Sequence, residues 1–75
     1  MTRLPIVSGR EVIAALVRIG YGVVRQRGSH VRMRHPTDTN RQPVTVPDHR
    51  TLKPGTLHAI LRDANLSVEQ LRELL

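Results

Sequence analysis

The chain has 75 residues and a formal net charge of +6, with no Cys, Trp or Phe and a single Tyr. This length predicts one domain over residues 1–75, and the lack of Cys excludes disulfides, thiolate catalysis and cysteine-ligated zinc. The apolar run at residues 12–17 is too short for a signal-peptide core or a membrane span, so we expect a cytoplasmic protein.

The positive charge is concentrated in the first half of the chain. Residues 1–35 carry seven Arg and one Glu, whereas residues 36–75 carry five basic and five acidic side chains. A fixed positive field attracts polyanions, and nucleic acid is the most common such partner, although many small basic domains simply present a solvated surface. Charge alone leaves both interpretations open.

A first helix is predicted over about residues 9–19. Ser8 and Glu11 have the spacing of a capping box, in which each side chain bonds the backbone amide of the other residue. Apolar residues then recur at helical spacing as far as Ile19, and Gly20 can take the left-handed conformation that ends many helices.

Two strands are predicted next, over residues 21–27 and 30–35, joined by a two-residue turn that begins with Gly28. Side chains in the second strand alternate between its two faces. The core face is expected to hold Val31 and Met33, and the opposite face is expected to hold His30, Arg32 and Arg34.

A short third strand is predicted at residues 44–46, stopped by Pro47. Pro54 suits the first turn of a second helix that runs up to Asn65, and Ser67 with Gln70 indicates a capping box before a third. The predicted order is α-β-β-β-α-α. This is an α+β fold in which helices cover one face of a three-stranded antiparallel sheet.

His30 is the strongest candidate for a catalytic residue. A lone His in a strand is most often only an exposed surface residue. In the functional interpretation, an RNA phosphate lies along Arg32 and Arg34 while His30 handles a proton as the neighbouring 2′-hydroxyl attacks phosphorus. Such a cleavage needs no metal but requires a second proton-transfer group, and His49, an arginine or water could each fill that role.

Arg25, Arg27, Arg32 and Arg34 place four cations on two paired strands with no acid among them. They form either a solvated edge or a phosphate-binding surface. The near absence of aromatic residues argues against a platform that stacks bases, so phosphate and shape contacts fit better. Lys53 could add a phosphate contact at the start of the second helix.

Neither a metal site nor a serine nucleophile is predicted. His30 and His35 would face opposite sides of a strand, no two His are four residues apart, and there is no Cys. Ser29 and His30 are neighbours whose side chains point apart, and no ordered Ser-His-acid set is evident. No cofactor is predicted.

Taken together, the residues resemble the HicA family of toxin–antitoxin toxins. The resemblance extends over nearly the whole chain, and the matching stretches lie at residues 8–12, 20–21, 28–30, 46–49 and 55–64. The resemblance implies a double-stranded-RNA-binding-domain-like fold and cleavage of mRNA in which the histidine of Gly-Ser-His, here His30, is essential. It also implies a HicB-type antitoxin that covers this surface.

Two features depart from the family pattern. Asn65 stands where Gly is usual at the end of the second helix, and the region around residues 25–34 is rich in Arg rather than Lys. The first concerns helix termination and the second RNA affinity.

The leading hypothesis is therefore a metal-independent endoribonuclease toxin with His30 as its catalytic residue. The main alternative is a non-catalytic double-stranded-RNA-binding module, which is weakened because Arg62 is the only cation in residues 54–65. A third possibility is a structural partner of an antitoxin with no affinity for RNA. The predicted RNA-binding residues are Arg25, Arg27, Gly28, Ser29, Arg32, Arg34 and Lys53.

Overall fold

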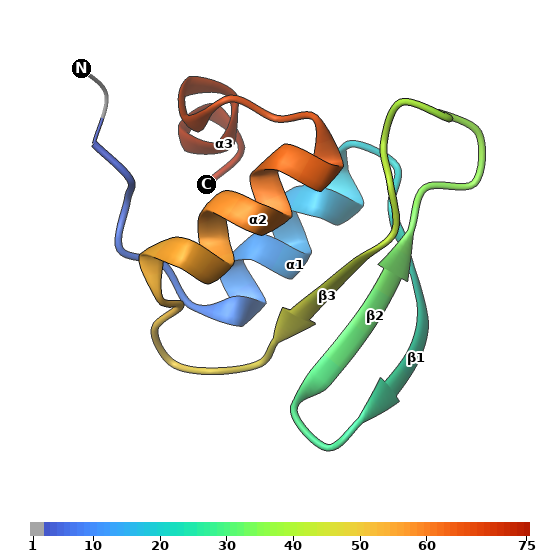
Figure 1. The fold of residues 1–75 in the computed structure, drawn as a ribbon, viewed down its shortest axis with the longest axis horizontal. Coiled ribbons are helices and arrows are strands. Elements are labelled where there is room, and N and C mark those ends of the chain that lie inside the picture. The colour runs from blue at the N-terminus through green and yellow to red at the C-terminus, as the bar shows by residue number, and fades with distance from the viewer. Residues whose placement is uncertain (1–2) are drawn as a thin grey trace.

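The computed structural model describes residues 3–75 and contains six elements in the predicted order (Figure 1). The strands form one antiparallel sheet in the order β1-β2-β3, which confirms the predicted α+β fold. None of the helices in residues 3–75 is long and apolar enough to cross a membrane. The elements are α1 (Gly9–Arg18), β1 (Gly22–Arg27), β2 (His30–Arg34), β3 (Val44–Pro47), α2 (Pro54–Ala64) and α3 (Val68–Leu74).

Local sequence determines where the helices begin and end. At the start of α1, the Ser8 amide donates to Glu11 Oε1 at 2.9 Å and the Glu11 amide donates to Ser8 Oγ at 3.1 Å. The same reciprocal pair of bonds opens α3. Gly20 has a φ of +105° just beyond α1, and Asn65 ends α2 with a φ of +56°. Asn thus supplies the left-handed residue that Gly would otherwise provide.

The hydrophobic core lies between one face of the sheet and the helices α1 and α2. Helix α3 packs against α1 and lies farthest from the sheet (Figure 1). The helices therefore occupy one side of the sheet, and its outer face stays open. The core side chains of β2 and β3 are Val31, Met33, Val44 and Val46, and those of the helices are Val12, Ala15, Leu16, Leu57, Ile60, Leu61, Ala64 and Leu71.

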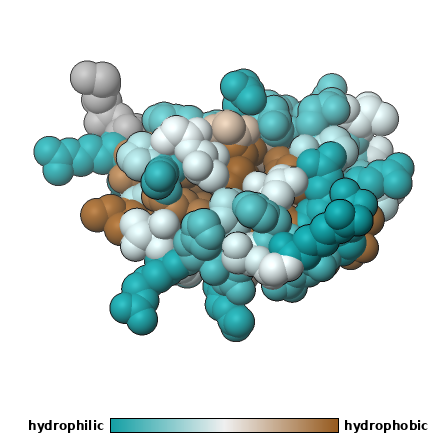
Figure 2. All heavy atoms as spheres, turned by 60° about the horizontal axis from the view of Figure 1, so that its bottom comes forward, coloured by the Kyte–Doolittle hydropathy of each residue, from teal (hydrophilic) through white to brown (hydrophobic). Residues whose placement is uncertain are grey.

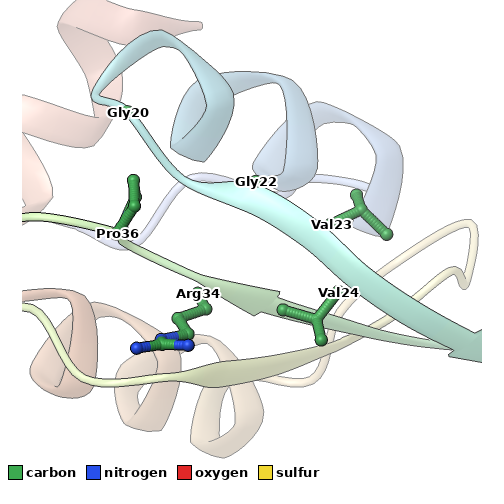
Figure 3. A pocket seen from close by; sticks show the side chains of 6 residues that line it. All are labelled: Gly20, Gly22, Val23, Val24, Arg34 and Pro36. Atoms are coloured by element: carbon green, nitrogen blue, oxygen red, sulfur yellow. The ribbon is translucent and has the colours of Figure 1, made fainter.

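A β-bulge interrupts β1 and changes which side chains share a face. Val23 is paired with Met33, but the next pair along the strands is Arg25 with Arg32, so Val24 is an extra residue in β1. Cross-strand partners lie on the same face of a sheet, so the bulge leaves Val23 on the helix side and turns Arg25 to the outer face. Figure 3 shows the Val23 and Val24 side chains on opposite sides of the strand.

Strand β1 is the exposed edge of the sheet. Every residue in it is exposed, and Val23 and Val24 retain 54% and 59% of their accessible surface. Beside them, Gly20, Gly22, Arg34 and Pro36 complete the lining of an open pocket at the start of the strand (Figure 3). The bulge and the arginines make this edge a poor template for pairing with another chain.

Candidate active site and nucleic-acid interface

The outer face of the sheet gathers the basic residues that the sequence analysis singled out. In β2, Val31 and Met33 are buried while His30 and Arg34 are exposed, as the alternation predicts. The bulge adds Arg25 and Arg27 of β1 to this same face, opposite Arg32 and His30 respectively. Long hydrophilic side chains project from the molecule in Figure 2, which turns the lower end of Figure 1, where the β1–β2 hairpin lies, toward the viewer.

Four of these basic residues surround one shallow hollow. Its lining consists of Arg25, Arg27, His30, Arg32 and Thr45. Arg32 is half-buried, and its Nη1 donates to Thr45 Oγ1 at 3.1 Å, which holds one guanidinium in place in the lining of the hollow. Three guanidinium groups and an imidazole with no acid among them form a site suited to an anion with several oxygen acceptors, such as a phosphodiester.

The turn that carries His30 is firmly built. Gly28 has a φ of +55°, as the predicted turn requires, and its carbonyl accepts from Gln26 Nε2 at 3.0 Å. The next carbonyl, that of Ser29, accepts from the Asp48 amide at 2.6 Å. The start of β2 is thus attached both to β1 and to the segment that follows β3.

This arrangement brings His49 next to the turn. The His49 Nε2 atom lies 3.4 Å from Ser29 Oγ, and its carbonyl accepts from the Gly9 amide at 2.8 Å. From the sequence alone, His49 is only one of three possible proton-transfer groups. The signal for its location was available in part, because His49 follows directly on the strand that pairs with His30.

His35 has a structural role. Its Nδ1 accepts from the Asp38 amide at 3.0 Å, so Nε2 carries the proton and donates to the Ile19 carbonyl at 2.8 Å. The ring also makes an edge contact with Tyr21, with centroids 5.4 Å apart. Within residues 3–75, no three or more His, Asp or Glu side chains gather in a way that would hold a metal ion.

Four of the predicted RNA-binding residues do not line the hollow. Gly28 and Ser29 form the turn between β1 and β2. Arg34 is on the outer face but at the other end of β2, where it lines the pocket of Figure 3. Lys53 is the exposed N-cap of α2 and belongs to the helical layer. The structure thus brings together Arg25, Arg27, His30 and Arg32 and places Lys53 apart from them.

A comparison with known protein families identifies the family to which this basic domain belongs. Residues 9–66 match the family described as the HicA toxin of bacterial toxin–antitoxin systems. The chain belongs to the HicA toxin family. A comparison with curated protein sequences finds no significant match. As a HicA toxin, the chain is one half of a toxin–antitoxin pair, so an antitoxin partner is implied.

The HicA match extends from the first residue of α1 to just beyond α2. It includes the whole sheet, and therefore every residue that lines the hollow. Helix α3 lies outside the match. The region shared with the family is thus the part of the HicA toxin that builds and positions the basic outer face.

Proposed function

We propose that this HicA toxin is an endoribonuclease that cleaves mRNA with His30 and requires no metal ion. The observation that carries the proposal is the position of His30, which is exposed at the rim of a hollow lined by Arg25, Arg27 and Arg32. A phosphodiester held in this hollow brings its reacting atoms close to an imidazole, a group that can serve as proton acceptor or proton donor.

The reaction is an internal transfer of the phosphoryl group. The 2′-oxygen of the nucleotide attacks the adjacent phosphorus while His30 accepts the hydroxyl proton, the bond from phosphorus to the 5′-oxygen breaks, and that oxygen leaves as a hydroxyl. The products are a 2′,3′-cyclic phosphate and a 5′-hydroxyl end. Negative charge grows on the phosphoryl oxygens in the transition state, and the three guanidinium groups around the hollow stabilise it.

The toxin holds RNA mainly through phosphates. The single Tyr is buried and the chain has no Phe or Trp, so the outer face offers no Phe, Tyr or Trp ring on which a base could stack. Phosphates on either side of the scissile bond lie along the remaining predicted contacts. These are Arg34, the Gly28–Ser29 turn and, at the start of α2, Lys53.

A HicB-type antitoxin neutralises the toxin by covering the outer face. This face is strongly basic and carries the proposed catalytic residue, so a partner with complementary acidic groups would bind it and exclude RNA at the same time. The toxin, its antitoxin and the mRNA substrate would all be found in the cytoplasm.

The decisive experiment incubates purified toxin with a long mRNA in excess EDTA and follows the RNA on a denaturing gel. The wild type is compared with His30→Ala and with His58→Ala, which removes an exposed histidine from α2 in the helical layer. Cleavage by the wild type and His58→Ala, but not by His30→Ala, is the expected result.

Other outcomes separate the alternatives. A fully active His30→Ala protein would remove His30 from the reaction. Binding to duplex RNA by every variant, with no cleavage by any, would instead establish a double-stranded-RNA-binding module. Only one basic residue, Arg62, lies on α2, so the second helix offers little charge for duplex binding.

A further inference from the structure

The cleavage reaction requires two proton transfers, and His30 can perform only one of them at a time. A proton must leave the attacking 2′-hydroxyl and another must reach the departing 5′-oxygen. A guanidinium stays protonated in proteins, so the arginines of the hollow supply charge rather than a transferable proton. The second proton-transfer group is therefore either water or another titratable side chain beside the hairpin turn.

The main chain at His49 is held on two sides. The Asp48 amide donates to the Ser29 carbonyl at 2.6 Å, and the Gly9 amide donates to the His49 carbonyl at 2.8 Å. Arg10 adds an ion pair with Asp48 at 3.5 Å. These contacts attach the segment after β3 both to the hairpin turn and to the first turn of α1.

The close approach of α1 to this segment depends on a residue without a side chain. A Cβ atom on Gly9 would lie 1.9 Å from the Pro47 carbonyl oxygen and 2.9 Å from the Asp48 Cα. Such overlap with backbone cannot be relieved by rotating a side chain. The fold thus holds the backbone at His49 in place, although His49 itself is exposed. Exposed loop segments are usually more mobile than this.

The His49 side chain lies at the hairpin end of the sheet, beside the turn that leads into His30. His30 is paired with Pro47, so the chain that leaves β3 emerges beside His30. The His49 Nε2 atom then lies 3.4 Å from Ser29 Oγ, next to the residue that immediately precedes His30. Two exposed imidazole groups, one at the start of β2 and one in the segment after β3, are therefore brought to the same end of the sheet.

The other histidines are not available for this role. Both ring nitrogens of His35 are hydrogen-bonded to the main chain at Ile19 and Asp38. His58 lies on α2, which covers the opposite face of the sheet. Of the four His in the chain, His30 and His49 alone are exposed at the hairpin end of the sheet.

We propose that His49 is the second catalytic residue and donates the proton to the leaving 5′-oxygen. In this step His30 gains the proton of the 2′-hydroxyl, the phosphorus–2′-oxygen bond forms, the phosphorus–5′-oxygen bond breaks, and protonated His49 transfers its proton to that oxygen. Solvent then restores both rings to their starting protonation states. The proposal rests on the endoribonuclease activity proposed above.

The test uses two RNA oligonucleotides that span one cleavage site mapped in the wild-type digest of mRNA. One carries the natural linkage, and the other carries sulfur in place of the bridging 5′-oxygen at that site. A thiolate leaves readily without being protonated, so loss of the proton donor slows only the oxygen substrate. We expect His49→Ala to cleave the natural linkage about 10²–10⁴-fold more slowly than the wild type and to regain most of its rate on the sulfur linkage.

Three further variants define the comparison. His30→Ala is expected to be slow on both substrates, because the sulfur substrate still needs a proton acceptor. His58→Ala is expected to match the wild type on both. His49→Gln keeps a group that can bond Ser29 Oγ but cannot transfer a proton, so it is expected to behave like His49→Ala; full activity of His49→Gln would show that the ring only positions Ser29 and would overturn the proposal.

The remaining outcomes test the role of His49 and the proposed endoribonuclease activity separately. A His49→Ala protein as fast as the wild type on the natural linkage overturns the assignment of His49 and leaves the proposed endoribonuclease activity intact. Rescue of His30→Ala instead of His49→Ala, or slow cleavage of both substrates by His49→Ala, overturns the role of proton donor. Failure of the wild type to cleave either RNA contradicts the proposed function itself. The backbone bonds at His49 involve main-chain atoms only, so both His49 variants should unfold at the wild-type temperature.

Discussion

At the scale of single residues, the two histidines at either end of β2 differ in the hydrogen bonding of their ring nitrogens. His30 is exposed beside three arginines, whereas both ring nitrogens of His35 bond to the main chain between the end of α1 and the loop after β2. Gly20 leaves the space that the His35 ring occupies, since a Cβ there would lie 2.5 Å from His35 Nε2. One histidine is therefore free for chemistry and the other holds the fold.

Alanine at these two positions should separate activity from stability. His35→Ala leaves the Ile19 carbonyl and the Asp38 amide without their partner, at a cost of about 1–3 kcal/mol in the free energy of unfolding. In a domain of this size each kcal/mol lowers Tm by about 4–8 °C. Thermal unfolding followed by circular dichroism should show this loss for His35→Ala and no loss for His30→Ala. An equal loss in both would contradict the division of roles.

Tyr21 provides a second test at this scale. Its hydroxyl donates to the Gln42 carbonyl at 2.7 Å, and burial raises the pKa of the phenol above its ordinary value of 10.0. The nearby carboxylates of Asp63 and Asp38 also raise this pKa, and Arg41 opposes them. The folded state therefore holds the phenolic proton more tightly than the unfolded state, so this contribution to stability is present below pH 10 and is lost as pH rises through the folded-state pKa.

The measurement compares the wild type with Tyr21→Phe. At neutral pH the variant should be less stable by about 1 kcal/mol, the typical value of one hydrogen bond, and the difference should shrink as pH rises above 10. Tyr21 is the only Tyr and there is no Trp, so the ultraviolet absorbance of tyrosinate reports its ionisation directly. A tyrosinate signal that titrates below pH 10 in the folded protein would show that burial does not raise this pKa.

At the scale of elements, the molecule depends on how closely α1 approaches the end of β3. The first residue of α1, Gly9, is buried against Pro47 and Asp48, with no room for a Cβ atom. Gly55, near the start of α2, has no atom within 4 Å of the corresponding position. The two glycines lie at similar positions in their helices, but Gly9 is closely packed against backbone and Gly55 faces open space.

Alanine should therefore have opposite effects at these glycines. Gly9→Ala forces backbone apart and should lower the free energy of unfolding by about 1–3 kcal/mol or more. Gly55→Ala adds a better helix former in open space and should raise it by about 0.5–1 kcal/mol. Chemical denaturation of the two variants beside the wild type gives both values, and stabilisation by Gly9→Ala would rule out the close contact.

At the scale of the whole molecule, the excess positive charge lies where it destabilises the isolated chain. The bulge at Val24 places Arg25 directly opposite Arg32, and like charges at opposed positions of a sheet are unfavourable. These exposed charges are screened by salt, so the cost is small, but no acidic side chain lines the hollow to offset it. A surface of this kind is better explained by binding a polyanion than by stability.

Salt dependence tests this interpretation, with His30→Ala as the background so that RNA stays intact. Four phosphate contacts on single-stranded RNA give a slope of about −3 in log affinity against log salt, or about a 50-fold loss between 50 and 200 mM. Arg25→Gln should reduce the slope by about 0.7 and slightly stabilise the fold.

The matched control is Arg72→Gln on α3, the helix farthest from the sheet, which makes the same change in net charge. Fluorescence anisotropy of labelled RNA measures both slopes. An identical reduction for Arg72→Gln would mean that net charge alone, and not the outer face, attracts RNA.

Local sequence signals were sufficient to predict the helices and strands of this protein and part of its candidate site. Capping boxes at Ser8 and Ser67, the glycine turn and the alternation of β2 are local signals, because each depends on residues within a few positions of one another. They were enough to predict the order α-β-β-β-α-α and to place His30, Arg32 and Arg34 on one face, as observed.

The rest of the candidate site is assembled by contacts between residues that are distant in sequence. Strict alternation in β1 would put Arg25 on the same face as Val23, and the bulge that separates them arises from pairing with β2. The position of His49 depends on contacts with Ser29 and Gly9, which are distant in sequence. Sheet register and the close packing of a helix on a loop are set by long-range contacts, which local patterns do not encode.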